Sequence, residues 1–406
     1  MTYVLDPDRL ARILPWAERY VAERKYPGLS VLVTQHGKEV YFNSTGLRDL
    51  HGGAPFARDT VARIYSMTKP ITAFTLMSLL EEGRFTLDAP VSRFLPEFEQ
   101  CHALVPGATR LDQAEPCAPP TLHQLLTHTS GLSYAFNQSL VSKAMAERDI
   151  MFKPNQGTLA VQCSETAALP LAFQPGTRWE YSVGIDIIGR VIEVMTGQSL
   201  GDVFQQRVFA PLGMKETAFD VPTERRGRFA SLYTPLSGDP MDLGRAVFGQ
   251  ETLREVDTSL GSPFLDPSLQ SGGGGLLGTI DDYMRFAECL RQRGQGPDGP
   301  LISPATAEFM MANHLPGDIA SMGPASFAEQ PMDGVGFSLG GAVVLDPARS
   351  RVPGSVGDFS WGGMASTFFW VNREHDFCVV MFTQLSPSSS YPARAELKAL
   401  VQGALI

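Results

Sequence analysis

The sequence predicts an α+β fold in which both ends of the chain contribute to one antiparallel sheet flanked by helices. Two observations lead to this prediction: β-rich runs lie at residues 28–46 and 336–385, and the part between them is mostly helical or irregular. The chain of 406 residues is also too long for one compact core. We therefore predict an α/β domain formed by residues 1–95 and 269–406, with a mainly helical domain, residues 96–268, inserted between its halves.

The N-terminal region is predicted to contain a helix followed by a β-hairpin. Asp6 can cap the helix, Pro7 suits its first turn, and apolar residues recur on one helical face as far as Val21. Two β-rich runs then flank the turn Gln-His-Gly at residues 35–37. The same region lacks the basic head and apolar core of a secretory signal, so we expect none.

The segment RIYSMTKPITAF, residues 63–74, places Ser66 and Lys69 three residues apart in an apolar run. The pattern predicts a strand that ends just before Ser66 and a helix from Thr68 to Gly83. Residues three apart share a helix face, so the Lys69 amine can reach the Ser66 hydroxyl, and a helix N-terminus favours negative charge on that oxygen. Apolar neighbours would strip water from the amine and favour its uncharged, basic form. We therefore predict a serine nucleophile with a lysine partner.

Two later segments add candidate site residues. Tyr181 opens a predicted helix at residues 181–197, where its hydroxyl can point into a cleft; a partly buried structural tyrosine is the alternative. Gly362 and Gly363 precede a predicted strand and allow a substrate to approach its backbone, so that the amide of Met364 could act as an oxyanion donor. A bend in the sheet is the alternative explanation for these glycines.

Two other patterns are similar to functional motifs but fit them poorly. Ser338 lies in GFSLG, which matches the G-x-S-x-G nucleophile elbow, yet a strand-like run follows it where the elbow requires a helix. The one histidine after it, His375, falls in a polar turn where a solvated side chain is expected. The glycine run at residues 270–279 lacks the Gly-Lys-Ser/Thr ending of a phosphate loop, so we expect it to let the chain pass close to another segment.

The ordered set of three motifs resembles the serine β-lactamase and penicillin-binding-protein superfamily; the motifs are Ser66-Met67-Thr68-Lys69, Tyr181-Ser182-Val183 and Trp361-Gly362-Gly363. The set is most similar to the class C branch and to the related family VIII carboxylesterases. The resemblance spans about residues 10 to 400, and further similar phrases are LLTHTSGL (125–132), PLGM (211–214), GGGGLLGTIDDYMRF (272–286) and LISPATAEFMM (301–311).

The resemblance implies a role for each motif. Ser66 would be the acylated nucleophile, and Lys69 would share in its activation. Tyr181 would act with Lys69 as general base and then return the proton to the leaving group. The backbone N–H groups of Ser66 and Met364 would form the oxyanion hole. Tyr134 is a further candidate, for the wall of the acyl pocket, with core packing as the alternative.

Two departures from the class C pattern bear on the substrate. Val183 stands where an asparagine is usual, and Trp361, which with Gly362 and Gly363 would contact the substrate, stands in place of a lysine. A site without those polar partners discriminates poorly in favour of penicillin-like substrates and suits a neutral ester. We therefore predict a serine carboxylesterase for small or apolar acyl esters. An acyltransferase, a β-lactamase or amide hydrolase with the same nucleophile, and a non-catalytic binding protein stay open.

Composition excludes several other classes of function. The net charge of −10 argues against nucleic acid or an anionic membrane as the main partner, and no apolar run is long enough to span a bilayer. The histidines show no metal-ligand spacing, so we expect no metal and no cofactor, and His128 is expected to be structural. Five scattered cysteines without C-x-x-C spacing favour free thiols and a cytoplasmic location. The oligomeric state stays open.

Overall fold

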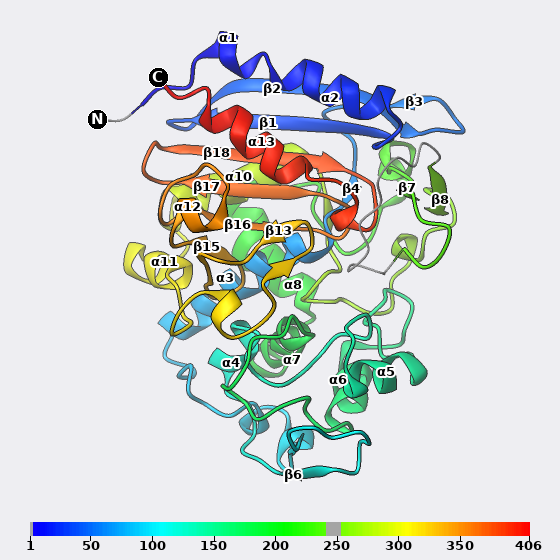
Figure 1. The fold of residues 1–406 in the computed structure, drawn as a ribbon, viewed down its shortest axis with the longest axis vertical. Coiled ribbons are helices and arrows are strands. Elements are labelled where there is room, and N and C mark those ends of the chain that lie inside the picture. The colour runs from blue at the N-terminus through cyan, green and yellow to red at the C-terminus, as the bar shows by residue number, and fades with distance from the viewer. Residues whose placement is uncertain (1–2, 241–252) are drawn as a thin grey trace.

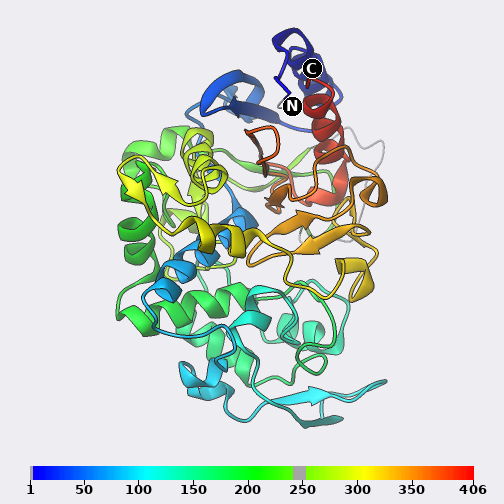
Figure 2. The same ribbon diagram turned by 90° about the vertical axis from the view of Figure 1, so that its left-hand side faces the viewer.

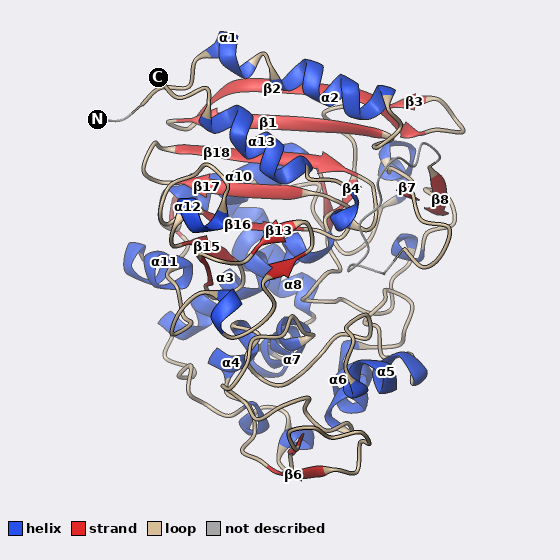
Figure 3. Cartoon of the chain, viewed as in Figure 1, coloured by secondary structure: helices blue, strands red, loops and turns tan. Residues whose placement is uncertain are grey.

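A large antiparallel sheet with helices on both faces forms one end of the molecule, and a mainly helical region forms the other (Figures 1 and 3). The computed structural model describes residues 3–240 and 253–406, and its sheet has the strand order β14-β15-β16-β17-β18-β1-β2-β3. The prediction that both chain ends share one antiparallel sheet is confirmed. The strands are β1 (Gly28–Gln35), β2 (Lys38–Asp49), β3 (Ala54–Pro55), β14 (Val335–Phe337), β15 (Ala342–Val344), β16 (Phe359–Gly362), β17 (Phe368–Asn372) and β18 (Phe377–Thr383).

Strand β1 joins the two halves of the sheet. Its side chains alternate between the faces, so that Val31 belongs to one hydrophobic core and Leu32 to the other. Its antiparallel register with β18 pairs Leu32 with Val380, and each core therefore receives apolar residues from both ends of the chain. The predicted hairpin turn links β1 to β2, with φ values of 52° at His36 and 72° at Gly37.

Helices from the two chain ends cover one face of the sheet, and helices from the middle of the chain cover the other (Figures 1 and 2). As predicted, Asp6 caps the first helix by accepting a hydrogen bond from the Arg9 amide at 2.8 Å. The face that carries Trp370 packs against α1 (Pro7–Leu10), α2 (Ile13–Ala22) and α13 (Ala393–Gln402). The face that carries Phe369 packs against α3 (Thr68–Glu81), α10 (Ile280–Arg291) and α11 (Pro304–Met311).

The chain between α3 and α10 supplies most of the helical region. Its helices are α4 (Leu122–Leu126), α5 (Leu140–Glu147), α6 (Leu159–Ala167), α7 (Gly184–Thr196), α8 (Leu200–Phe204) and α9 (Ala210–Leu212), and α12 (Pro347–Ser350) follows β15. Short strand pairs are β4 (Ala62–Arg63) with β9 (Leu277–Gly278), β5 (His102–Leu104) with β6 (Ala114–Pro116), β7 (Leu232–Thr234) with β8 (Arg254–Asp257), β10 (Gln295–Gly296) with β11 (Gly299–Pro300), and β12 (Ser326–Phe327) with β13 (Gln330–Pro331). None of the helices in the described ranges combines the length and the apolar character needed to cross a membrane.

The domain boundaries at residues 95 and 268 stay a prediction. Strand β7, which comes before residue 268 in the chain, lies against the sheet, because the Tyr233 amide donates a hydrogen bond to Gln384 O at 3.0 Å, just beyond β18. The Tyr233 ring also belongs to the core on the α13 side of the sheet. This strand therefore connects the middle of the chain with the sheet close to the candidate site.

Candidate active site

A cavity of about 660 Å³ beside strand β16 brings the predicted site residues together. Ser66, Tyr134, Tyr181 and residues 361–364 line this cavity, although they come from four separate parts of the chain. Lys69 lies behind Ser66 and is fully buried. The cavity is within the size range of small-molecule sites, which supports a substrate-binding role for this region.

Ser66 lies where strand β4 turns into helix α3, as the sequence predicts. The strand is shorter than expected: it comprises only Ala62–Arg63, which pair with the two residues of β9. Tyr65, directly before the nucleophile, has a φ of 42°, which is a strained value for a residue with a large side chain. The fully buried Arg63 anchors this segment through its guanidinium, which donates to the Asp257 carboxylate at 2.8 Å. The strained turn thereby presents the Ser66 hydroxyl to the cavity.

Three acceptors surround the amine of Lys69. Lys69 Nζ donates to Gly273 O at 2.7 Å, to the Tyr134 hydroxyl at 2.9 Å and to Ser66 Oγ at 3.3 Å. An ammonium carries three protons, whereas a neutral amine carries only two, so three acceptors match the charged form. The glycine run supplies one of them, which fits the expectation that it passes close to another segment. The predicted loss of the Lys69 proton stays untested, and the hydrogen-bond geometry of the free enzyme favours the ammonium.

Asp186, on the first turn of α7, is a residue that the sequence reasoning missed. Its carboxylate accepts hydrogen bonds from the Ser271 hydroxyl, from the Gly273 amide at 3.0 Å and from the Tyr134 hydroxyl at 3.2 Å. Burial raises the pKa of Asp186, and the positive charge of Lys69 opposes that rise. An acid among the apolar residues of the predicted helix 181–197 was the signal in the sequence that could have revealed it.

The two tyrosines beside Lys69 have different environments. The Tyr181 hydroxyl donates to Ser66 Oγ at 2.7 Å, and its ring centre lies 4.6 Å from Lys69 Nζ. The Tyr134 hydroxyl instead donates to Asp186, and burial together with that carboxylate raises its pKa well above the usual value. A phenol that resists ionisation is a poor base, so Tyr181 is the better candidate to take the Ser66 proton. Tyr134 lines the cavity, as expected, but its hydroxyl also binds Lys69.

His128 packs behind Tyr181 and forms no hydrogen bond with Ser66. The ring centres of His128 and Tyr181 are 4.8 Å apart, and His128 Nδ1 accepts a hydrogen bond from the Ser182 amide at 3.3 Å. Burial lowers the pKa of His128 well below its usual value, and the Lys69 charge acts in the same direction. A neutral imidazole that supports the Tyr181 ring agrees with the structural role expected from the sequence.

The turn after β16 provides free amide donors beside Ser66. Within the described residues, the backbone N–H groups of Ser66 and Met364 form no hydrogen bond. The turn is held closed by the Gly363 amide, which donates to Thr367 O at 2.8 Å. A Cβ at Gly363 would lie 2.3 Å from Ile64 O, so only glycine allows the turn to approach the segment before Ser66 this closely. Two unpaired N–H groups near a nucleophile are what an oxyanion hole requires.

Arg394 supports this turn from the side of α13, and the sequence reasoning missed it. Its guanidinium donates to Gly363 O at 2.9 Å and to Thr367 O at 3.3 Å. A Cβ at Gly362 would lie 2.5 Å from Arg394 Cζ, so a larger residue there would have to displace the guanidinium. Glu329, from the β12–β13 hairpin, forms a buried ion pair with Arg394 at 3.2 Å. The hairpin and the oxyanion turn are therefore joined through one guanidinium.

Aromatic rings form the wall of the cavity next to the nucleophile. Phe327, from β12, stacks on Trp361 with the ring centres 6.0 Å apart and the planes 8° from parallel. The Tyr181 ring contacts both of them, with centre distances of 4.8 Å to Phe327 and 5.5 Å to Trp361. Trp361, standing in place of the lysine usual in the class C pattern, therefore contributes apolar surface beside Tyr181.

Ser338, the alternative serine of the sequence analysis, forms a hydrogen bond with the backbone and does not line the cavity. The side chain is fully buried, and its hydroxyl donates to Gly341 O at 2.8 Å. No helix follows it as an elbow would require, since β15 begins at Ala342. His375, expected at the surface, is buried instead, because its ring packs against Tyr3.

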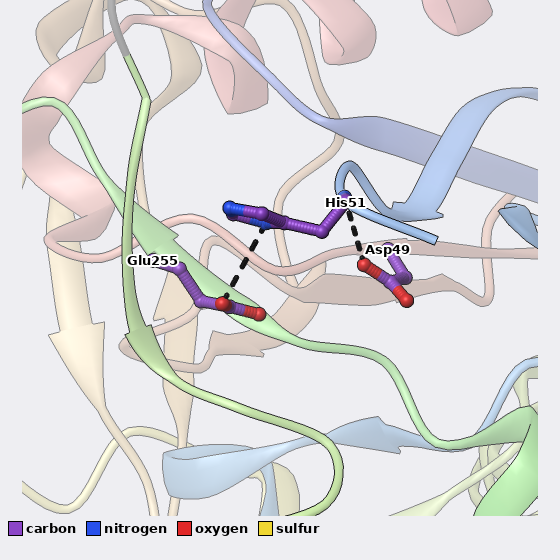
Figure 4. Close-up of side chains that lie close together, drawn as sticks. All are labelled: Asp49, His51 and Glu255. Carbon is purple, nitrogen blue, oxygen red and sulfur yellow. Dashed lines mark hydrogen bonds and ion pairs between the residues drawn. The ribbon is translucent and has the colours of Figure 1, made fainter. Parts of the chain in front are cut away.

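One group of potential metal ligands occurs in the described residues, and none of its three members lines the cavity (Figure 4). The side chains of Asp49 and Glu255 flank His51. The Asp49 carboxylate accepts hydrogen bonds from the His51 and Gly52 amides, at 2.9 and 3.0 Å, and so stabilises its own turn. The His51 side chain is 78% exposed, and we assign no ion to this group.

Comparison with known proteins agrees with this geometry. Residues 15–403 match the family described as Beta-lactamase. The chain belongs to the β-lactamase family.

Among relatives in this family, Esterase EstB of Burkholderia gladioli is 32% identical over 94% of this chain and 92% of its own. The Lovastatin esterase of Penicillium rubens is 32% identical over 88% of each chain. A solved structure titled "EstCE1, a hydrolase with promiscuous acyltransferase activity" superposes with a TM-score of 0.78 at 26% identity, over 98% of each chain. The similarity therefore extends over nearly the whole chain and includes relatives named as esterases.

Replacing Gly363 with alanine tests the oxyanion turn. The added Cβ would push the turn away from Ile64 O, so we expect kcat to fall about 100-fold or more while the protein stays folded. Gly227→Ala is the matched control, because a Cβ at Gly227 meets nothing within 4 Å. Steady-state kinetics with a short-chain aryl ester, after a circular-dichroism check of folding, gives the comparison. Equal activity of the two variants would contradict the assignment.

A pair of tyrosine variants tests which phenol is the base. Tyr181→Phe removes the group that contacts Ser66, and we expect kcat to fall about 1,000-fold or more. Tyr134→Phe removes one acceptor of Lys69 and one donor to Asp186, and we expect a smaller loss of about tenfold. If Tyr134→Phe proves at least as damaging as Tyr181→Phe, the assignment of the base is wrong.

Proposed function

We propose that this chain is a serine carboxylesterase that hydrolyses small or apolar acyl esters through an acyl-enzyme on Ser66. The observation that carries the proposal is the position of Ser66 Oγ, within hydrogen-bonding distance of both Tyr181 and Lys69. Ser66 and Met364 line the same cavity, and their free amides can stabilise the oxyanion of a tetrahedral intermediate. Relatives named as esterases that cover most of the chain support the same activity.

Acylation would proceed by transfer of the Ser66 proton to Tyr181. Tyr181 can accept this proton only after it has released its own, so the reactive form of the site carries a Tyr181 phenolate, whose oxygen lies 2.7 Å from Ser66 Oγ in the structure. That oxygen accepts the Ser66 proton as Ser66 Oγ attacks the ester carbonyl. The C–O bond to the alcohol then breaks, and Tyr181 returns the proton to the leaving alkoxide. The products of this half-reaction are a free alcohol and an ester of Ser66.

Deacylation would repeat these steps with water. Tyr181 accepts a proton from the water as its oxygen attacks the acyl-Ser66 carbonyl, and the proton then returns to Ser66 Oγ. The free acid leaves, and the enzyme is regenerated. No metal or redox step is needed in this scheme, since every proton that leaves Ser66 or water returns within the cycle.

The walls of the cavity favour a neutral acyl group next to the scissile bond. Trp361 and Phe327 present stacked rings there, and Val183 is fully buried and offers no amide side chain to a substrate. A β-lactam carries an amide and a carboxylate that would find fewer polar partners here than in a penicillin-recognising enzyme. An apolar ester is therefore the favoured substrate, and β-lactam or amide hydrolysis is the less favoured one.

Transfer to an alcohol is the second candidate activity. An acyl-enzyme reacts with whichever hydroxyl enters the site, and an apolar cavity admits alcohols as well as water. One similar solved structure is titled as a hydrolase with promiscuous acyltransferase activity, which supports this candidate. Both activities would share Ser66, and they differ only in the acceptor that completes the cycle.

We also propose that the protein is cytoplasmic and that its binding partners are small-molecule esters. All five cysteines are free thiols in the structure, which is the usual state in a reducing compartment.

Serine-to-alanine variants at two positions test the nucleophile. Ser66→Ala should reduce the hydrolysis of a short-chain aryl ester to less than about 1% of the parent rate, because no other group can form the acyl-enzyme. Ser338→Ala is the matched control and should keep most of the activity, since its hydroxyl only bonds Gly341 O. Mass spectrometry after treatment with an alkyl phosphonate ester should place the label on Ser66 in the parent protein. A labelled Ser338, or an active Ser66→Ala enzyme, would refute the proposal.

A further inference from the structure

The cavity beside Ser66 continues past the oxyanion turn to the opposite side of strand β16. Its walls include Ser66 and Tyr181 at one end and Arg394 and Lys398, from helix α13, at the other. Between these ends the same cavity is lined by Ser360, Gly362 and Phe368, and the Arg394 guanidinium lies over Gly362, where a Cβ would be 2.5 Å from its Cζ. A substrate whose ester lies at Ser66 can therefore extend a second group towards α13.

The far part of the cavity has an apolar floor. Ser360 pairs with Trp370, so Ser360 lies on the sheet face that α13 covers. Phe368, two residues before Trp370 on β17, lies on the same face and opposite Gly362. Val344 and Phe368 both line the cavity. A flexible hydrocarbon chain fits such a floor.

Lys398 lies next to this apolar floor, and its amine forms no hydrogen bond or ion pair with the described residues. The residue is 6% exposed. Its contacts are the faces of Phe368 and Trp370, whose ring centres lie 5.8 and 5.9 Å from Nζ. A buried cation without a counter-ion is costly, which makes it a candidate for binding an anionic ligand.

The charges around Lys398 do not neutralise it at contact distance. Arg394, one turn earlier on α13, is already paired with Glu329. Asp358 is near enough to act on Lys398 electrostatically, but its carboxylate accepts hydrogen bonds from the Asn372 side chain at 2.8 Å and the Ser355 amide at 3.1 Å instead. The amine of Lys398 therefore stays available to a ligand.

We propose that Lys398 forms a subsite for a carboxylate that the ester substrate carries several bonds away from its scissile carbonyl. The inference rests on the proposed esterase activity and adds a substrate class to it: esters with a remote acidic group joined by an apolar chain. The carboxylate can belong to the acyl part, as in a monoester of a dicarboxylic acid, or to the alcohol part, as in an acylated ω-hydroxy acid. Both sources offer the same ion to Lys398.

Matched esters test the charge preference. The mono-4-nitrophenyl ester of adipic acid is compared with 4-nitrophenyl hexanoate for an acid on the acyl part. The butanoate of an ω-hydroxyhexanoic acid is compared with hexyl butanoate for an acid on the alcohol part. In one of these pairs we expect kcat/KM to be about tenfold or more higher for the charged ester, as a hydrogen bond between two charged groups provides. No preference for the charged ester in either pair would overturn the proposal.

Lys398→Met removes the charge and keeps the apolar stem, and Lys398→Gln provides a second variant should the first fail to fold. Either variant should lose the preference through a higher KM for the charged ester and leave the uncharged ester unchanged. Lys143→Met, at an exposed lysine on α5, is the control and should behave like the parent protein. An equal loss for both esters in a folded Lys398 variant would show a structural role only and overturn the subsite.

A binding experiment separates the subsite from the esterase activity. Calorimetry on the Ser66→Ala protein measures binding without any turnover. Monomethyl adipate is compared with methyl hexanoate, and the butanoate of ω-hydroxyhexanoic acid is compared with hexyl butanoate. Tighter binding of a charged ligand that Lys398→Met abolishes supports the subsite even if the parent enzyme hydrolyses no ester. Hydrolysis by the parent enzyme without such binding would leave the esterase function intact and refute the subsite.

Discussion

The buried ammonium of Lys69 is the interaction on which the rest of the site depends. A cation without access to water is stable only where acceptors and negative charge surround it, and here they come from Ser66, Tyr134 and Gly273, with Asp186 behind them. Each acceptor belongs to a different part of the chain, so this one amine links the turn before α3, the loop that carries Tyr134 and the glycine run. The same amine lies 4.6 Å from the centre of the Tyr181 ring, and the Tyr181 hydroxyl donates a hydrogen bond to Ser66 Oγ. The hydrogen bonds of the Lys69 amine thus both hold these segments together and position Ser66.

The sequence could predict those features that depend on local spacing. Ser66 and Lys69 are three residues apart, and the geometry of a helix turn alone places their side chains together. The hairpin at His36 and Gly37 and the cap at Asp6 are likewise decided by neighbours in the chain. Alternating apolar residues in both chain ends predicted one shared sheet, because a strand buried on both faces needs partners on either side.

Residues that act through the tertiary fold could not be predicted in the same way. Asp186 lies on an apolar helix, and its carboxylate contributes to the site through hydrogen bonds from Tyr134 and Gly273, which are distant in the sequence. Arg394 is more than 200 residues from Tyr181 in the sequence, yet its guanidinium supports the turn that supplies an oxyanion donor. Phe327 lies in a two-residue strand, which is too short to show a hydrophobic periodicity in the sequence. Such residues carry no local signature, since their function depends on contacts made by segments far apart in the chain.

The charge state of Lys69 tests this account most directly. Selective ¹³C labelling of the lysine ε carbons, with the Lys69 signal assigned by its absence in Lys69→Met, distinguishes an ammonium from a neutral amine by NMR. The account predicts an ammonium signal in the free enzyme at neutral pH that shifts when Asp186 is replaced by asparagine, because the buried Asp186 carboxyl group interacts electrostatically with Lys69. A neutral amine at Lys69, or a signal that is indifferent to Asp186→Asn, would contradict it.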